Sequence, residues 1–333
     1  MKKALFLSDD PGNIRRVYGE KGIAALAASY DFLSPGPVSG RELLASGGKY
    51  RGAEIVFSTW GMPALSSGEI ADALPRLEAV FYGAGSVQAF ARPFLERGIR
   101  VFSAWAANAV PVAEYALSAI LLAGKGFFSC LPLKEDRAAA SAAFRTFRGN
   151  YGEKVGLLGL GMVGKEVAKL LKPYRLEVLY YDPFFDRSRE EEFGVTPASL
   201  EEIFSDCAVI SNHIANLPAT VGMLDYALFS RMRPNAFFLN TGRGAQVVEA
   251  DLVRALTEVP TRTALLDVTM PEPPEPGHPF YRMKNVFLTP HIAGSAGDEC
   301  LRMGEYMISE ADSFVRGEPL KWEVSVKMLE TMA

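Results

Sequence analysis

The sequence predicts an α/β protein with two doubly wound parallel sheets, one domain being inserted into the other. Short apolar runs typical of strands alternate with segments of helical periodicity over the first hundred residues, and the alternation starts again near residue 155. The length of 333 residues is enough for two domains that each bury a core. We expect residues 1–108 with 297–333 to form one domain and residues 109–296 to form the other.

The first domain is expected to contain a small parallel sheet, because neighbouring parallel strands must be joined by crossover connections, which are usually helices. The expected strands are residues 4–7, 31–33, 54–58, 79–81 and 100–102, and the clearest helical patterns are residues 14–28 and 68–74. A further amphipathic helix is expected at residues 298–315, where Met303 and Met307 lie one turn apart and suit core packing.

A long apolar helix is expected between the two domains, over residues 110–123. Asn108 is a candidate N-cap, and Pro111 would lie in the first turn. The helix carries Glu114 and is too short in this prediction to span a bilayer. Residues 131–150 are then expected to form a solvated connection.

The second domain is expected to have six strands, which matches the two mononucleotide-binding halves of a dinucleotide-binding, or Rossmann, domain. These strands are residues 155–158, 177–181, 207–211, 235–240, 263–268 and 285–288. Residues 199–204 and 250–257 are among the helical segments between them.

A glycine-rich stretch, GLGMVG at residues 159–164, follows the first of these strands and opens a helix. Gly159 permits the tight turn, Gly161 lets the backbone approach a pyrophosphate, and Gly164 lets the helix pack closely on the strand. The free N–H groups and positive dipole end of the helix favour phosphate binding. Asp182 ends the next expected strand, at the distance typical of a ribose-binding carboxylate. The first strand, the helix, the next strand and Asp182 all agree with the glycine-rich stretch, and together they predict a dinucleotide site.

Asp182 also predicts NAD rather than NADP. A carboxylate accepts hydrogen bonds from both ribose hydroxyls of NAD, whereas it repels the 2′-phosphate of NADP. No cation follows directly in Pro183-Phe184-Phe185-Asp186, and Arg187 is expected at the surface.

Three ionisable residues follow three consecutive expected strands of this domain: Arg243, Glu272 and His291. Doubly wound folds bind ligands at the carboxyl ends of their strands, so the three are expected near one another. Arginine can hold a carboxylate and polarise a carbonyl, histidine can exchange a proton with the carbonyl oxygen, and a carboxylate can orient the imidazole and favour its protonated form. This chemistry suits the interconversion of a 2-oxo acid and a 2-hydroxy acid.

Each of the three also has an ordinary interpretation. His291 could be a core histidine bonded to the backbone, Arg243 a surface residue at a helix start, and Glu272 a solvated loop residue. Their joint occurrence on a dinucleotide-binding chain with three histidines favours the catalytic interpretation. Of the other two histidines, His213 is expected to line the cofactor cleft and His278 to lie in an exposed loop.

The composition favours a cytoplasmic protein that acts on small molecules. A net charge of −4 gives no electrostatic reason to expect nucleic acid or an anionic membrane as partner. The N-terminus has no adequate apolar segment for a secretory signal. Cys130, Cys207 and Cys300 lie far apart without adjacent histidines, which predicts buried thiols rather than a disulfide or a metal site.

The motifs together resemble the D-isomer-specific 2-hydroxyacid dehydrogenases, strongly over about residues 152–294 and more loosely in the flanking segments. The resemblance rests on the glycine-rich stretch with Asp182, on NTGRG at 240–244, on LDV at 266–268 with PEP at 271–273, and on TPHIAG at 289–294. The spacings from Arg243 to Glu272 and from Glu272 to His291 are similar to those of the family.

The resemblance implies a Rossmann domain inserted into a flavodoxin-like substrate domain, and a homodimer built largely on the cofactor domain. It implies Arg243, Glu272 and His291 as the catalytic set and Asp267 as the contact of the nicotinamide carboxamide. The cofactor-binding residues are then Gly159, Gly161, Met162, Val163, Gly164, Asp182, His213, Asn240, Thr241, Gly242, Asp267 and Gly294.

The substrate domain resembles the family less closely. Gly83, Ala84 and Gly85 look like the loop whose N–H groups hold the substrate carboxylate. Trp60 is a candidate lining residue, as is Trp105, for which core packing is at least as good an interpretation. The chain departs from the family at Ser86-Val87-Gln88-Ala89-Phe90 and at Ala215-Asn216, where many members have an Asp-Asn type sequence and a proline.

Two other function classes stay open at this point. One is an NAD-sensing binding or regulatory protein of the same family with little turnover. The other is a formate- or phosphite-type dehydrogenase on the same scaffold, in which no ketone is protonated.

Overall fold

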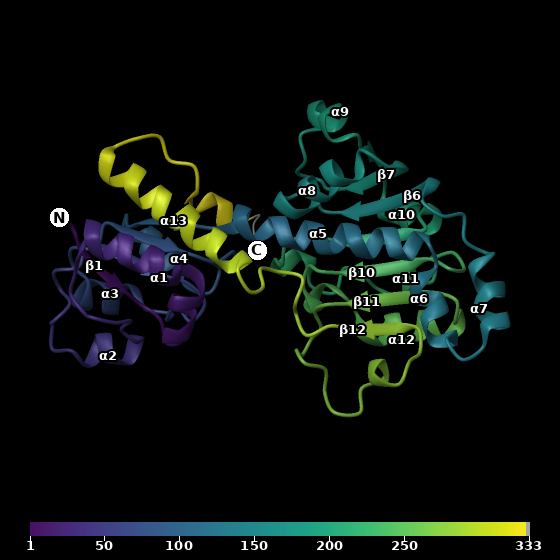
Figure 1. The fold of residues 1–333 in the computed structure, drawn as a ribbon, viewed down its shortest axis with the longest axis horizontal. Helices are drawn as coiled ribbons and strands as arrows, with labels where there is room; N and C mark the ends of the chain where they lie inside the picture. Colours follow the sequence, from purple (N-terminus) through teal and green to yellow (C-terminus); the bar gives the residue numbers. More distant parts are fainter. Residues whose placement is uncertain (331–333) are drawn as a thin grey trace. The chain divides into compact units, whose positions relative to one another are not determined.

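The structure, a computed structural model, describes residues 1–330. The chain divides into two compact units (Figure 1). Unit 1 consists of Met1–Asn108 and the segment that begins at Ser295, and unit 2 is Ala109–Gly294. The expected division placed the second boundary two residues later, between residues 296 and 297, and its last three residues lie outside the described part of the chain.

Unit 1 is built on a six-stranded sheet with the order β13-β5-β4-β3-β1-β2. The strands are β1 (Lys3–Phe6), β2 (Asp31–Phe32), β3 (Ile55–Ser58), β4 (Ala79–Tyr82), β5 (Arg100–Ser103) and β13 (Glu323–Val324). The first five pair in parallel, as predicted, whereas β13 pairs antiparallel with β5. A two-residue strand has only a weak pattern in the sequence: β2 was predicted, at residues 31–33, whereas β13 was not.

Both faces of this sheet are buried. Neighbouring strand residues enter different apolar clusters, Leu5 one and Phe6 the other, because successive side chains of a strand point to opposite faces. The helices are α1 (Pro11–Ser29), α2 (Gly40–Ala45), α3 (Ser67–Ala73), α4 (Ala91–Glu96) and α13 (Glu299–Arg316). Helix α13 packs against α1 (Figure 1). A Cβ on Gly304 would lie 2.3 Å from the Val17 carbonyl oxygen, so glycine is required for this approach.

Unit 2 is built on a seven-stranded parallel sheet with the order β12-β11-β10-β9-β6-β7-β8. The strands are β6 (Tyr151–Leu158), β7 (Arg175–Tyr181), β8 (Thr196–Pro197), β9 (Val209–Asn212), β10 (Phe237–Asn240), β11 (Thr263–Leu266) and β12 (Val286–Leu288). Six neighbouring strands of this sheet, in the order β11-β10-β9-β6-β7-β8, have the arrangement of two mononucleotide-binding halves. The two halves meet at β6 and β9. The prediction of six strands missed β8, a two-residue edge strand, and counted β12 in its place.

The helices of unit 2 cover both faces of its sheet (Figure 1). They are α6 (Phe127–Cys130), α7 (Arg137–Phe144), α8 (Met162–Leu171), α9 (Glu190–Phe193), α10 (Leu200–Asp206), α11 (Tyr226–Phe229) and α12 (Glu249–Glu258), and most of α5 (Trp105–Gly124). Short 3₁₀ turns occur in unit 2 at Leu131–Leu133, Arg187–Arg189, Pro218–Thr220, Gly244–Gln246 and Pro279–Tyr281. In unit 1, a 3₁₀ turn occurs at Lys327–Glu330.

Helix α5 differs from its prediction at its start. It begins at Trp105, five residues earlier than expected, so Asn108 lies inside the helix and is not its N-cap. The Asn108 side chain instead accepts a hydrogen bond from the Ser295 backbone N–H at 3.0 Å. With 20 residues the helix is long enough to cross a membrane, so the length argument was wrong. Its Ala113, Ala116 and Ile120 nevertheless lie in the apolar core of unit 2.

The segment after α5 also differs from its prediction. Residues 131–150 contain the 3₁₀ turn Leu131–Leu133 and helix α7, where a solvated connection was expected. Several apolar side chains of this region are nevertheless exposed, including Leu131 at 44% and Phe144 at 51%. The three cysteines are free, and Cys207 and Cys300 are buried as expected, whereas Cys130 is only partly buried.

Candidate active site

The glycine-rich turn joins β6 to α8, and each of its glycines meets a different surrounding. Gly159 has φ +89°, and a Cβ there would lie 2.9 Å from the His213 carbonyl oxygen. A Cβ on Gly164 would lie 2.0 Å from the Gly159 carbonyl oxygen, so the helix can pack on the turn only with glycine at this position. By contrast, no atom lies within 4 Å of the Cβ position of Gly161. Gly161 therefore faces open space.

This open space lies at the start of helix α8. Gly161 is the N-cap residue of α8 and offers no side-chain acceptor to the first N–H groups of the helix, which begins with Met162 and Val163. Uncapped N–H groups at a helix start suit a phosphate, and the lack of a Cβ at Gly161 leaves room for one. The turn therefore fits the pyrophosphate of a dinucleotide.

Asp182 directly follows β7 and is fixed by two backbone N–H groups. Its Oδ2 accepts from Leu160 at 2.7 Å, and its Oδ1 accepts from Phe184 at 2.8 Å. The first bond ties the carboxylate to the glycine-rich turn itself. A carboxylate has about four acceptor sites, so two ribose hydroxyls can still donate to it.

His213 follows β9 and lies between two hydroxyl groups. Its Nε2 is 2.8 Å from Ser211 Oγ, and its Nδ1 is 3.2 Å from Thr241 Oγ1. Burial lowers the pKa of His213 to about 3, so the ring is neutral at physiological pH. The ring is neutral and hydrogen-bonded, and the His213 backbone carbonyl lies close to Gly159, which agrees with a lining role rather than with proton transfer.

A buried amide cluster shapes the turn after β10. Asn240 Oδ1 accepts from the Gly242 N–H and from Asn212 Nδ2, both at 3.0 Å. Gln246 Oε1 accepts from Asn212 Nδ2 at 2.6 Å and from the Arg243 N–H at 3.2 Å. Asn212 and Gln246 are fully buried. Neither residue was predicted from the sequence, although Asn212, a polar side chain at the end of an apolar strand, was a usable signal.

Arg243 extends from this turn. Its Nη1 donates to the Gly242 carbonyl at 2.7 Å, and its own carbonyl accepts from Asn240 Nδ2. Burial lowers the pKa of the Arg243 guanidinium, and the negative charge of Glu272 acts in the opposite direction. Arginine stays protonated in proteins, so Arg243 supplies a fixed cation in the turn after β10.

Glu272 and His291 form a direct pair. The Glu272 Oε1 to His291 Nδ1 distance is 2.7 Å, and the side chains are 39% and 47% exposed. His291 has φ +54°, in the left-handed region, which costs a residue with a Cβ about 1 kcal/mol. The Glu272 contact uses one ring nitrogen and leaves Nε2 for a ligand.

Asp267 lies just beyond β11 and holds the segment that carries His291. Its Oδ1 accepts from Thr289 Oγ1 at 2.6 Å and from the Ile292 N–H at 2.8 Å. Its Oδ2 accepts from the Ala293 N–H at 2.9 Å. The carboxylate is therefore already engaged with protein donors, in addition to any contact with a cofactor. Gly294 ends this segment at the boundary of unit 2.

The glycine loop after β4 has fewer free N–H groups than the prediction assumed. The Gly83 N–H donates to the Ser58 carbonyl at 2.7 Å, and the Ala84 N–H donates to the Tyr82 carbonyl at 2.9 Å. Within residues 1–330 the Gly85 N–H has no acceptor, so it is the group of the three that a ligand can use.

The other candidates of unit 1 make packing contacts. Trp60 packs partly buried against both apolar clusters, with the Arg16 guanidinium 5.2 Å from its ring centre. Trp105 meets Trp322 edge to face at 6.0 Å, which agrees with core packing. Gln88 donates to the Leu329 carbonyl at 2.8 Å, so this departure from the family supports the C-terminal segment.

His278 was expected to be an exposed loop residue, but it is partly buried. Its Nδ1 accepts from the Phe280 N–H at 3.4 Å, and its Nε2 is 3.5 Å from Glu249 Oε2. Glu249 also accepts from the Met270 N–H at 2.8 Å, so it contacts the chain on both sides of Glu272. Across the described residues, no group of three metal-ligating side chains is present.

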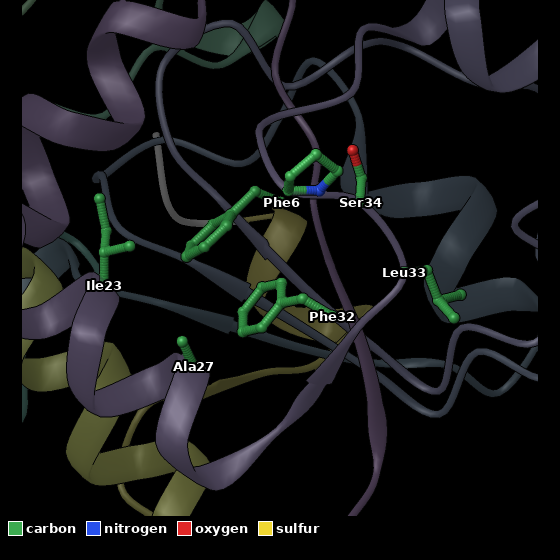
Figure 2. Close-up of a pocket in the computed structure, with 7 residues that line it drawn as sticks. Phe6, Ile23, Ala27, Phe32, Leu33 and Ser34 are labelled. Carbon is green, nitrogen blue, oxygen red and sulfur yellow. The ribbon is translucent and has the colours of Figure 1, made fainter.

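A hollow of about 420 Å³ lies in unit 1 (Figure 2). Ile23 and Ala27 of α1 face Phe6 and Phe32 across it. Its lining residues are Phe6, Ile23, Ala27, Phe32, Leu33, Ser34 and Pro35. None of these side chains titrates, so the hollow offers no group for acid–base chemistry.

Comparison with known proteins identifies the second unit. Residues 133–293 match the model of the D-isomer specific 2-hydroxyacid dehydrogenase NAD binding domain. The chain is 32% identical to D-3-phosphoglycerate dehydrogenase of Archaeoglobus fulgidus over 71% of its length and 44% of that protein. It is 34% identical to the putative 2-hydroxyacid dehydrogenase YoaD of Bacillus subtilis over 60% of its length and 59% of that protein. The chain thus spans about half the length of these curated relatives.

A solved structure shares the whole fold. The phosphoglycerate oxidoreductase of Rhizobium etli superposes with a TM-score of 0.81 at 23% identity, over 99% of this chain and 100% of the other. The two-sheet α/β architecture predicted from the sequence is thereby confirmed, and unit 2 is an NAD-binding domain.

Proposed function

We propose that this chain, which belongs to the D-isomer-specific 2-hydroxyacid dehydrogenase family, interconverts a 2-oxo acid and a D-2-hydroxy acid with NAD. The observation that carries the proposal is the 2.7 Å pair of His291 and Glu272. The three residues follow β12, β11 and β10, three neighbouring strands of the NAD-binding sheet. Bound NADH would supply the hydride.

Each residue of this set has a distinct task. The Arg243 guanidinium binds the substrate carboxylate and polarises the carbonyl, because its planar fork suits a carboxylate. His291 gives a proton from Nε2 to the carbonyl oxygen in reduction and takes it back in oxidation. Glu272 accepts from Nδ1, which orients the ring and stabilises the imidazolium.

The cofactor residues divide into backbone and side-chain groups. The N–H groups of Met162 and Val163 would hold the pyrophosphate in the space left by Gly161, Gly159 and Gly164 shape the turn, and Asp182 would hold the ribose. Asp267 would contact the nicotinamide carboxamide, and His213 and Thr241 would line the cofactor cleft. The Gly85 N–H and Trp60 contact the substrate from unit 1.

The test is a panel of 2-oxo acids with NADH, followed by the loss of NADH absorbance. Glyoxylate, hydroxypyruvate, pyruvate, phenylpyruvate and 3-phosphohydroxypyruvate cover small, apolar and charged substituents. We expect turnover with at least one of them, and its loss in His291→Ala. NADH binding without turnover of any 2-oxo acid would instead support an NAD-sensing protein, and oxidation of formate or phosphite alone would support the other alternative.

We also propose a cytoplasmic homodimer formed through unit 2. Large apolar side chains are exposed along one stretch of this unit: Leu122, Phe127, Leu131, Phe144 and Tyr151. Their clustering in sequence within α5, α6, α7 and the start of β6 supports a protein interface, since such residues are usually covered. Light scattering coupled to size-exclusion chromatography tests this; a monomer at micromolar concentration would contradict it.

A further inference from the structure

The His291 segment is tied to helix α5 through a chain of three side chains. Tyr115 Oη lies 3.0 Å from Thr289 Oγ1, and Thr289 Oγ1 lies 2.6 Å from Asp267 Oδ1. Asp267 is 2% exposed, and Tyr115 and Thr289 are half-buried. This series of hydrogen bonds thus begins at Tyr115 on α5 and ends at Asp267 in the core of unit 2, beside the proposed active site.

The direction of the hydrogen bonds follows from the chemistry of the groups. A carboxylate only accepts, so the Thr289 hydroxyl must donate its one hydrogen to Asp267. Thr289 Oγ1 is then an acceptor towards Tyr115, whose hydroxyl donates. Burial raises the pKa of Tyr115 above its usual value, which keeps that proton in place. The order of donation is therefore Tyr115 to Thr289 to Asp267.

The other bonds of Asp267 act on His291 directly. Its carbonyl accepts from the His291 N–H at 3.0 Å, and its carboxylate accepts from the next two backbone N–H groups, those of Ile292 and Ala293. The His291 N–H is shared with the Thr289 carbonyl, also at 3.0 Å, so Asp267 and Thr289 together hold the backbone at the point where His291 adopts φ +54°. The imidazole is bonded to Glu272, and its position also depends on this backbone.

We propose that Thr289 and Tyr115 are positioning residues of the reaction, which hold Asp267 so that it fixes the backbone of His291. The proposal rests on the proposed function for its catalytic consequence. The proposal goes beyond a contact between Asp267 and the cofactor, because it assigns a role to Thr289, which bonds Asp267, and to Tyr115, which bonds Thr289. A network with all of its polar groups satisfied also makes a backbone segment rigid.

The decisive pair of variants is Thr289→Val and Thr289→Ser. Valine keeps the shape of threonine but removes the donor to Asp267, whereas serine keeps the hydroxyl. We expect kcat for 2-oxo acid reduction to fall at least tenfold in Thr289→Val, with the Kd for NADH within twofold of wild type, and to recover to within about threefold in Thr289→Ser. Tyr115→Phe should lose about two- to fivefold. Tyr226→Phe removes a tyrosine hydroxyl bonded to Glu258 on another helix and serves as the matched control.

A second readout needs neither cofactor nor activity. The chain has three histidines, so the ring C–H signals of His291, His213 and His278 can be assigned by single substitutions in NMR spectra of the full chain. We expect Thr289→Val to move or broaden the His291 signal and to leave that of His278 unchanged. The spectrum reports on the hydrogen-bond chain even if no 2-oxo acid is turned over, so the two proposals can fail separately.

Three results would overturn the positioning role. One is a Thr289→Val variant with unchanged kcat and an unchanged His291 signal. Another is a loss confined to NADH affinity, which would make Asp267 a cofactor contact alone. The third is an equal loss in Thr289→Ser and Thr289→Val, because the hydroxyl would then be irrelevant.

Discussion

The two halves of the NAD-binding sheet make their parts of the site in different ways. In the half from β6 to β8, the glycine turn offers backbone N–H groups, and Asp182 is held by two backbone bonds. In the half from β9 to β12, Arg243, Glu272 and His291 offer side chains. Backbone geometry is fixed by the turn itself, whereas side-chain geometry needs supporting residues. The first half is therefore local in sequence, and the second depends on contacts between distant residues.

The largest effect is expected from the side-chain half. His291→Ala should lower kcat by about 10²- to 10⁴-fold with a small change in KM, because the proton donor is lost.

Arg243→Ala should lower kcat and raise KM together, since the same cation binds the carboxylate and stabilises the developing oxyanion. Steady-state kinetics with the best substrate of the panel measure both. Unchanged NADH-dependent turnover in His291→Ala would remove its assigned role.

The backbone half can be tested by two glycine substitutions three residues apart. Gly164→Ala should destabilise the fold by about 1–3 kcal/mol, because its Cβ would meet the Gly159 carbonyl oxygen. Gly161→Ala should leave the free energy of unfolding nearly unchanged, since its Cβ enters open space, but should weaken NADH binding at least tenfold. Denaturant unfolding and NADH titration separate the two effects. If Gly161→Ala binds NADH normally, the pyrophosphate does not lie there.

Cofactor choice is expected to depend on Asp182. NADH should be preferred over NADPH by at least about tenfold in kcat/KM, or roughly 1.4 kcal/mol. Asp182→Ala should shrink this preference, chiefly by weakening NADH, because the ribose loses its acceptor. Kinetics with both cofactors measure the ratio, and a preference of the unmodified protein for NADPH would contradict this interpretation.

The smallest expected effect concerns the pH dependence of reduction. We expect Glu272→Gln to alter the pH profile of reduction, because it removes the negative charge that is bonded to the ring of His291, the proposed proton donor. His213→Gln is the matched control, because a pKa of about 3 keeps His213 neutral at physiological pH. Profiles of kcat/KM against pH for the unmodified protein, Glu272→Gln and His213→Gln test this prediction. If His213→Gln changes the pH at which the rate of reduction falls, His213 rather than His291 would be the proton donor.

The predicted positions of the elements were accurate where a segment is long or strongly patterned. Helix α13 was expected at residues 298–315 and is Glu299–Arg316. The two-residue strands β8 and β13 were missed because such strands are defined by their neighbours in the sheet. The start of α5 was placed five residues late because Asn108 looks like an N-cap, and its side chain instead bonds the Ser295 backbone.

The sequence by itself determined the dinucleotide turn, because the function of a glycine at a given spacing depends on local backbone geometry. It also determined which residues follow the carboxyl ends of the strands, and therefore Arg243, Glu272 and His291 as candidates. Only the tertiary structure decided that Glu272 meets His291 at 2.7 Å, and that the Gly83 and Ala84 N–H groups are already bonded. Only the tertiary structure showed that Thr289 and Tyr115 support Asp267. Tyr115 lies 174 residues from Thr289, and no local pattern records a hydrogen bond between groups that folding alone brings together.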